Sequence, residues 1–211
     1  MIQEIQDKPG QQRGLAICVS GPSGVGKGTI IRSVLARRPS IRHSVSITTR
    51  RPRPGEKNGI DYYFVDHPTF ERMIADDEIL EHDCYCDQYY GTPRKPLAEA
   101  IGSGLDVILD ITVPGSLSIM QKIPECVTIF LLPPSFSELE NRLLKRGTET
   151  DDIVRKRLEK ARHEVTMADR FQYLVVNDDL AETAQRILAI IDAEHCRYPY
   201  QAGIEQVVLA R

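Results

Sequence analysis

The apolar positions of the chain fall into short continuous runs that are separated by amphipathic stretches. The runs span residues 15–19, 107–109, 126–132 and 173–176, and each is long enough for a single strand. Continuous apolar runs are typical of parallel strands that are buried on both faces, and the stretches between them have helical periodicity. The pattern therefore predicts an α/β fold with a parallel sheet core and helices on both faces.

Polar residues mark the expected starts of two helices late in the chain. Ser135 and Glu138 have the spacing of a capping box, in which each side chain bonds a backbone N–H near the other residue. Thr150 is placed to cap a second helix that carries Ile153, Leu158 and Ala161 on its apolar side. We expect helices to begin at both points.

Two segments interrupt the alternation of strands and helices. Residues 46–92 are rich in Arg, Pro and Tyr, and residues 137–165 are charged and helical. We expect an inserted lobe from the first segment and a helical insertion from the second. The core then consists of residues 14–45, 93–136 and 166–195, with an N-terminal extension at 1–13 and a C-terminal tail at 196–211.

Composition and charge narrow the expected location and partners. The 211 residues, 41% of them hydrophobic, fit one compact unit with lobes, and the net charge of −3 provides no global basic field for nucleic acid or a membrane. The polar N-terminus lacks a signal-peptide apolar region, and the apolar runs are too short to cross a bilayer. Five cysteines without C-x-x-C spacing suggest buried or incidental thiols in a reducing compartment. We expect a cytoplasmic protein with no nucleic-acid or membrane partner, and the sequence indicates no oligomeric state.

A glycine-rich stretch between the first apolar run and the next expected helix predicts a nucleotide-binding loop. In this position successive backbone N–H groups encircle the β-phosphate of a nucleotide, and Lys27 reaches toward the γ-phosphate. A glycine-rich turn with an exposed lysine is the alternative, which the flanks and the spacing disfavour. The expected ATP-binding residues of this loop are Gly21, Pro22, Ser23, Gly24, Val25, Gly26, Lys27, Gly28 and Thr29.

The loop departs from its usual form at the residue that follows the lysine. A hydroxyl that ligates Mg²⁺ usually stands there, whereas this chain has Gly28 and then Thr29, and one helical step turns a side chain by about 100°. We therefore expect water at that position of a bound Mg²⁺. Asp110 follows the apolar run 107–109, which is the pattern of an aspartate on a second strand that binds Mg²⁺ through water. A turn or a helix cap is the alternative for Asp110.

A second cluster of candidate anion ligands lies in the inserted lobe. Arg50, Arg51 and Arg53 fall within four positions, and two prolines stiffen the segment. Guanidinium groups match the geometry of phosphate. In isolation such a run is most often a solvated or nucleic-acid surface. Here it shares its lobe with Tyr62 and Tyr90, whose hydroxyls also bind small anions, and we expect an anion site.

These stretches resemble the guanylate kinase family of nucleoside monophosphate kinases over residues 14–195. The motifs that carry the resemblance are G-P-S-G-x-G-K, S-x-T-T-R-x-P-R-x-G-E-x-x-G-x-D-Y, E-(x)8-Y-G-[ST] and R-L-x-x-R-G-T-E-(x)7-R-L. The resemblance implies a P-loop fold, a GMP-binding lobe at 46–92 and a mobile lid at 137–165. It also implies an ATP:GMP phosphotransferase that uses Mg²⁺ and yields ADP and GDP.

By that resemblance the lobe contacts both the phosphate and the base of GMP. Glu81 has a physical reason for its role as well. Guanine presents N1–H and a 2-amino group side by side, so an ionised carboxylate accepts from both, whereas adenine has a lone pair at N1 and no 2-amino group. An exposed, structurally ordinary glutamate is the alternative. The implied GMP-binding residues are Arg50, Arg53, Tyr62 and Tyr90 for the phosphate, Glu56 to order the arginines, Ser46, Glu81 and Thr92 for the base, and Asp110.

The chain departs from the family pattern after Asp110. The family usually continues Asp-x-Asp-x-Gln-Gly, and its second acid helps bind the purine, but here Thr112 and Pro114 replace the acid and the Gln. This departure leaves open a kinase for another nucleoside monophosphate. A protein-binding module of the same fold that does not phosphorylate is a further alternative, which the intact loop around Lys27 disfavours.

Three arginines in the second insertion complete the expected chemistry. The resemblance places them on the lid that closes over ATP, where they neutralise the phosphoryl group in transfer, and it places Asn177 beside the adenine. A solvated basic helix is the alternative for the arginines, and a turn for Asn177. No general base is required, because a phosphomonoester has its second pKa near ~6 and is largely ionised at neutral pH. The expected catalytic residues are Lys27, Arg50, Arg142, Arg146 and Arg157.

Overall fold

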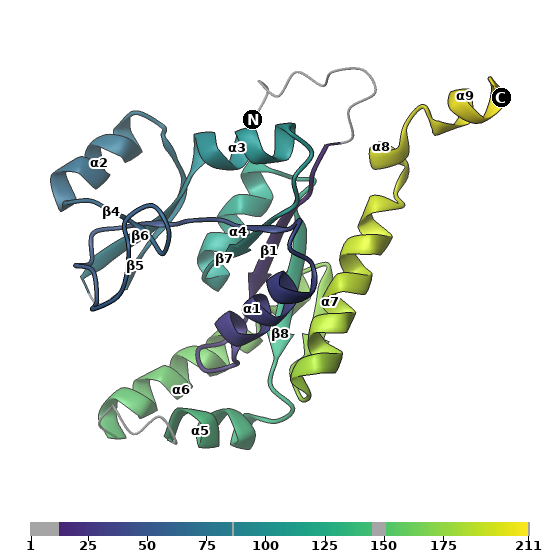
Figure 1. Ribbon diagram of the computed structural model, residues 1–211. Coiled ribbons are helices and arrows are strands. Elements are labelled where there is room, and N and C mark those ends of the chain that lie inside the picture. Colours follow the sequence, from purple (N-terminus) through teal and green to yellow (C-terminus); the bar gives the residue numbers. More distant parts are fainter. Residues whose placement is uncertain (1–12, 86, 145–150, 211) are drawn as a thin grey trace.

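A parallel sheet forms the centre of the computed structural model, which describes residues 13–85, 87–144 and 151–210 (Figure 1). Its strand order is β2-β7-β1-β8-β9, and every neighbouring pair is parallel. Four of these strands coincide with the predicted apolar runs, so the expected α/β class is confirmed. The strands are β1 (Ala16–Ser20), β2 (Arg42–His43), β7 (Val107–Asp110), β8 (Val127–Leu132) and β9 (Tyr173–Val176).

Helices cover both faces of this sheet because β1 is buried on each side. Ile17 and Val19 of β1 pack in one cluster with α1 (Lys27–Arg37) and α7 (Leu180–His195). Ala16 and Cys18, which point the opposite way, pack in a second cluster with α3 (Arg94–Gly102) and α4 (Val113–Lys122). The continuous apolar run at 15–19 thus reflects burial of alternate residues against two different helix layers.

A smaller sheet with the strand order β4-β3-β6-β5 forms the inserted lobe. Helix α2 (His67–Ala75) covers one face of it, where the Phe70 ring stacks on Tyr89 and lies edge-on to His82. Because side chains alternate along a strand, residues next to Tyr89 and His82 face the opposite side. The strands are β3 (Ile47–Thr48), β4 (Tyr63–Phe64), β5 (Ile79–Tyr85) and β6 (Gln88–Pro93).

The second insertion consists of α5 (Phe136–Leu144) and α6 (Asp151–Val165), which lie together at one end of the molecule (Figure 1). The Ser135 hydroxyl accepts from the Glu138 N–H at 3.1 Å, which confirms the predicted cap. Thr150 lies outside the described residues. The predicted apolar side of α6 is wrong at one position: Ile153 is 45% exposed, whereas Val154 and Ala161 are buried. Val154 and Ala161 are seven residues apart and so share a face, which Ile153 does not.

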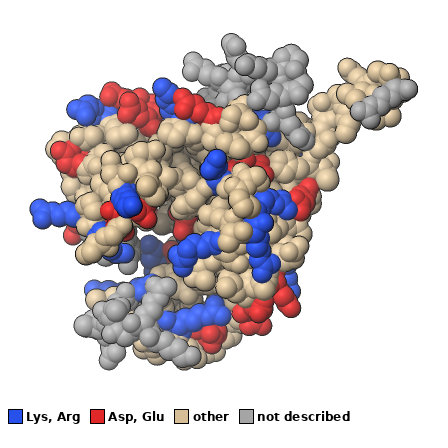
Figure 2. All heavy atoms as spheres, viewed as in Figure 1, with Lys and Arg blue, Asp and Glu red and all other residues tan. Residues whose placement is uncertain are grey.

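A hollow separates the inserted lobe from α5 and α6. Figure 2 shows it between these two parts of the surface, with Lys and Arg side chains at its edge. At the other end of the chain, a short 3-10 turn (Ala168–Arg170) precedes β9, and α8 (Tyr198–Gln201) and α9 (Ile204–Leu209) follow α7 and lead away from the body (Figure 1). Within the described ranges, no helix is both long and apolar enough to cross a membrane.

Candidate active site

The glycine-rich loop wraps around a cavity at the start of α1. Residues 21–29 line this space of about 340 Å³ together with Arg32. Gly21 and Gly26 have φ angles of 148° and 97°, and a Cβ on them would lie 2.5 Å from the Leu131 carbonyl oxygen and 2.8 Å from Asn177 Nδ2. Glycine is therefore required at both positions by conformation and by space. The first residues of α1, 27–29, line the cavity, and a helix N-terminus is the arrangement that binds phosphate.

Lys27 points to the carboxyl end of β7, where two oxygens hold its ammonium group. Its Nζ donates to the Ile111 carbonyl at 2.7 Å and lies 3.2 Å from Asp110 Oδ1. Ser20 Oγ donates to the same carbonyl at 3.1 Å. The lysine is thus positioned above the loop by the neighbouring strand, and the structure brings Lys27 and Asp110 together as an ion pair.

The surroundings of Gly28 are suited to a hydrated Mg²⁺. A Cβ on Gly28 would lie 3.9 Å from Asp110 Oδ2, so the space usually taken by a hydroxyl faces a carboxylate. The Thr29 hydroxyl is exposed and accepts from Arg32 Nη2 at 3.3 Å. No group of three His, Cys, Asp or Glu residues that suits a metal occurs in the described part of the chain. Mg²⁺ in kinases is held by one or two carboxylates, waters and the nucleotide phosphates, and Asp110 fits that donor set.

Helix α6 contacts the phosphate loop through Ser23. Arg157 donates to the Ser23 hydroxyl from Nε at 3.1 Å and from Nη2 at 2.9 Å. The Ser23 N–H donates to Glu164 Oε2 at 3.2 Å. Glu164 is buried, and burial raises the pKa of its carboxyl. The structure therefore places Arg157 at the loop as expected and adds Glu164, which no sequence motif indicated.

Arg142 and Asn177 converge on the back of the same loop. Asn177 Nδ2 donates to the Val25 carbonyl at 2.7 Å, and Arg142 Nη1 reaches that carbonyl at 3.4 Å and the Asn177 carbonyl at 3.3 Å. Arg142 Nε also donates to Glu138 at 2.9 Å. Both predicted residues thus lie at the loop, while Arg146 lies outside the described residues.

The arginine-rich segment is ordered by one carboxylate. Glu56 accepts from Arg50 Nη1 at 3.0 Å and Nη2 at 2.9 Å, and from the Arg53 N–H at 2.7 Å. These bonds lower the pKa of Glu56 and raise that of Arg50. The Arg50 guanidinium lies 5.3 Å from the centre of the Tyr62 ring, which in turn is 6.2 Å from the Tyr90 ring. Arg50, Tyr62 and Tyr90, which are expected at the GMP phosphate, therefore share one patch with Glu56. The exposed Arg53 lies at the edge of this patch.

Glu81 lies opposite Thr92 in the strand pair of β5 and β6, on the face that α2 leaves open. Thr92 Oγ1 donates to its Oε1 at 2.7 Å, and the residue is only 5% exposed. Burial raises the pKa of this carboxyl. A Cβ on Gly115 would lie 2.5 Å from Glu81 Oε2, so the glycine at this position lets α4 approach the carboxylate closely.

Thr112 has a different task from the acid that it replaces. Its hydroxyl accepts from the Gly115 N–H at 3.2 Å, which caps α4, and donates to Asp83 Oδ2 at 2.9 Å. Asp83 follows Glu81 by two residues on β5, so the period of the strand is the signal that would have found it. Two carboxylates, Glu81 and Asp83, consequently lie against the first turn of α4.

A small cavity joins the two halves of the site. It measures about 120 Å³ and lies between the lobe and the end of β7. The cavity is lined by His43, Ser44, Ser46, Asp61, Tyr62 and Asp110.

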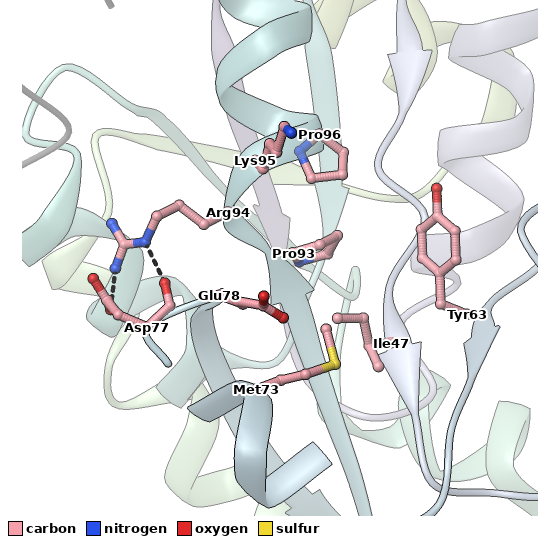
Figure 3. A pocket seen from close by; sticks show the side chains of 9 residues that line it. All are labelled: Ile47, Tyr63, Met73, Asp77, Glu78, Pro93, Arg94, Lys95 and Pro96. Carbon is pink, nitrogen blue, oxygen red and sulfur yellow. Dashed lines mark hydrogen bonds and ion pairs between the residues drawn. The ribbon is translucent and has the colours of Figure 1, made fainter. Parts of the chain in front are cut away.

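A larger cavity of about 550 Å³ lies outside this site (Figure 3). In Figure 3 the side chains of Ile47 and Met73 point toward one another across it, and the Arg94 to Asp77 pair closes one side. Ile47 and Tyr63 belong to the cluster that packs under α2, so the cavity opens on the α2 side of the small sheet. It contains none of the predicted site residues.

Comparisons with known proteins point to one family. A family model described as Guanylate kinase matches residues 13–194. The guanylate kinase of Latilactobacillus sakei is 48% identical over 188 residues, covering 89% of this chain and 93% of the relative. That of Thermus thermophilus is 49% identical over 185 residues, covering 88% and 84%. The crystal structure of guanylate kinase from Anaplasma phagocytophilum matches with a TM-score of 0.78 at 35% identity, covering 95% of this chain and 96% of that one.

Proposed function

The chain belongs to the guanylate kinase family and is an ATP:GMP phosphotransferase, and we propose that it acts through the cleft between the phosphate loop and the inserted lobe. The observation that carries this assignment of the cleft is the position of Asp110. Its Oδ1 lies 3.2 Å from Lys27 Nζ on the loop side, and it lines the same cavity as Ser46 and Tyr62 on the lobe side. Two anion-binding patches therefore meet at one residue. The relatives reported above support neither another monophosphate nor a module without activity.

The lobe side binds GMP in this proposal. Arg50, Arg53, Tyr62 and Tyr90 hold its phosphate, and Glu56 fixes Arg50 in the planar orientation that pairs with two phosphate oxygens. The base extends toward Glu81, which accepts from guanine N1–H and the 2-amino group. A carboxylate whose burial raises its pKa binds such a donor edge strongly, because the bonds form away from water. The remaining GMP contacts are Ser46, Thr92 and Asp110.

The loop side binds ATP. Backbone N–H groups of the glycine-rich loop surround the phosphates, Lys27 neutralises the γ-phosphate, and Asn177 lies beside the adenine. Asp110 holds Mg²⁺ through water, and Mg²⁺ supplies charge neutralisation of the ATP phosphates. Arg142 and Arg157, together with Arg146, belong to a lid at 137–165 that closes over the cleft. The contacts of Arg157 with Ser23 support this, since they already join α6 to the loop.

The reaction needs alignment and charge neutralisation and no proton acceptor. An oxygen of the ionised GMP phosphate attacks the γ-phosphorus, and the bond to the bridging oxygen of ADP breaks in line with it. Lys27, Arg50 and the lid arginines offset the negative charge of the two nucleotides. Closure of the lid over the cleft excludes the water that would otherwise receive the phosphoryl group.

The setting of the enzyme follows from composition and from the cysteines. We place the reaction in the cytoplasm, with no nucleic acid or membrane as partner, because the net charge is −3 and the described cysteines are free thiols. The domain limits that we propose are a core of 14–45, 93–136 and 166–195 with the lobe and lid inserted.

Lys27→Ala tests the proposed site. The phosphate loop assignment predicts a loss of turnover by about 100-fold or more, because Lys27 offsets charge that develops during transfer. The measurement is ADP release with GMP, dGMP, AMP and UMP as acceptors, and thermal melting confirms the fold. Lys95→Ala, at a residue whose side chain is 85% exposed on α3, is the matched control. A Lys27→Ala variant with near-normal rate would refute the assignment.

A further inference from the structure

Asp83 places a second carboxylate on the base side of the cleft. It lies two residues beyond Glu81 on β5, and the residue between them, His82, packs toward Phe70 at 6.3 Å between ring centres on the α2 side. Glu81 and Asp83 therefore share the opposite face, which looks toward the cleft and α4. Across the strand pair, Asp83 lies opposite Tyr90 and Glu81 lies opposite Thr92.

Two hydrogen bonds fix the orientation of the Asp83 carboxylate. Thr112 Oγ1 donates to Oδ2 at 2.9 Å, and the Cys84 N–H donates to Oδ1 at 2.8 Å. Each carboxylate oxygen has two lone pairs, so each retains a site for a ligand. The charge of Asp83 also contributes to the raised pKa of Glu81 and of Glu164, after burial as the main cause in both. Asp83 is thus held in a fixed orientation with acceptor sites to spare.

The donor edge of guanine calls for more than one carboxylate. It carries N1–H and the two hydrogens of the 2-amino group, whereas Glu81 has two oxygens, one of which already accepts from Thr92 at 2.7 Å. Glu81 takes N1–H and one amino hydrogen. The second amino hydrogen then needs another acceptor, because an unpaired donor in a buried site weakens binding.

We propose that Asp83, positioned by Thr112, accepts the second 2-amino hydrogen of guanine and is a further specificity-determining residue of this enzyme. The inference rests on the proposed placement of the GMP base at Glu81. It assigns two different tasks to the two acids: Glu81 selects guanine over adenine, and Asp83 selects guanine over hypoxanthine, which keeps N1–H and lacks the 2-amino group. It also accounts for the hydroxyl at Thr112, which orients the acid on the facing strand.

The test compares GMP with IMP as acceptors for the Asp83→Asn variant. An amide has one acceptor oxygen, so it cannot accept from Thr112, the Cys84 N–H and the ligand as a carboxylate does. We expect kcat/KM for GMP to fall about 10- to 100-fold, with kcat/KM for IMP within about threefold of wild type and the KM for ATP unchanged. Asp76→Asn, at an exposed residue at the end of α2, is the matched control and leaves the ratio of GMP to IMP unchanged.

A second pair of variants tests Thr112 as a positioning residue. Thr112→Val removes the hydroxyl, and we expect it to lower the ratio of kcat/KM for GMP to that for IMP by less than Asp83→Asn does. Thr112→Ser keeps the hydroxyl, and we expect the wild-type ratio. The double variant Asp83→Ala with Thr112→Asp moves the carboxylate to position 112, whose hydroxyl oxygen lies 2.9 Å from Asp83 Oδ2 in the wild type. We expect its preference for GMP over IMP to exceed that of Asp83→Ala alone.

Equal losses for GMP and IMP, or no loss for either, in variants that melt like the wild type would overturn the inference. If Asp83→Asn fails to fold, the Thr112→Val and Thr112→Ser pair decides by the same ratio. Wild-type enzyme that does not phosphorylate GMP would instead refute the proposed use of the cleft, so the two failures are distinguishable.

Discussion

Glu81 is 5% exposed, and its burial raises the pKa of a carboxyl that, in the proposed site, must be ionised to bind guanine. A raised pKa means that the ionised form is less favourable in the folded chain than in the unfolded chain. This destabilisation is fully present above the raised pKa. It disappears as the pH falls through the raised value toward the ordinary value of 4.5. The buried, ionised carboxylate of Glu81 thus lowers the stability of the fold, and in the proposed site the same carboxylate recognises the base.

Glu81→Gln therefore separates binding from stability. At pH 7.5 we expect a melting temperature equal to or above that of wild type, with a difference that shrinks as the pH is lowered toward 5. The KM for GMP rises about 10- to 100-fold, because the amide offers one acceptor oxygen to two donors, while the KM for ATP is unchanged. Thermal melting at several pH values measures the stability, and initial rates measure the two KM values. Glu71→Gln, at an exposed residue of α2, is the control, and a destabilised Glu81→Gln variant with normal KM for GMP contradicts the role.

In the proposed site, Glu56 acts on GMP through the arginines. Glu56→Gln removes the charge that accepts from both terminal nitrogens of Arg50 and from the Arg53 N–H. We expect the KM for GMP to rise about 10-fold while the melting temperature changes little, because the guanidinium loses its fixed orientation. Initial-rate kinetics measure the KM for GMP, and Glu99→Gln, at an exposed residue of α3, is the control. An unchanged KM for GMP would show that Arg50 needs no such support.

At the scale of elements, α6 is joined to the phosphate loop by Ser23. Arg157→Ala removes both bonds to the Ser23 hydroxyl, and we expect kcat to fall about 10²- to 10³-fold with little change in the KM for GMP, since the arginine neutralises the group in transfer. Saturating kinetics give the two constants separately. Arg170→Ala, at a side chain that is 72% exposed, is the control. A normal kcat with a lower melting temperature would make Arg157 a purely structural contact.

The elements that could be predicted from the sequence are those long enough to show a run or a repeat of apolar residues. The strands β1, β7, β8 and β9 were all expected, whereas β2 has two residues, Arg42 and His43, both exposed, and so no apolar signal. In α6 the predicted apolar side is wrong at one position, because Ile153 and Val154 are both apolar and only the packing of the folded chain decides which of them is buried.

The site divides in the same way. The phosphate loop and the arginine segment are local motifs, and they were found from sequence. The bonds of Ser23 with Glu164 and of Asp83 with Thr112 join residues 141 and 29 positions apart. No local period or motif encodes such pairs, because they arise when α6 and α4 pack against the loop and the lobe.

At the scale of the whole molecule, the fold brings the two patches that we propose for the two nucleotides to one cleft. One patch is the start of α1 beside the parallel sheet, and the other is the open face of the inserted lobe. Asp110 lies between them. In the proposed reaction, both nucleotides are therefore bound at once, with their phosphates facing each other.

An inhibitor that joins adenosine and guanosine through a polyphosphate chain tests this claim most directly. Initial rates at varied ATP and at varied GMP give its mode of inhibition, and calorimetry gives its Kd. We expect competition with both substrates, a Kd below that of either nucleotide alone, and weaker binding to both Lys27→Ala and Glu56→Gln. Competition with only one of the two substrates would contradict the facing arrangement of ATP and GMP.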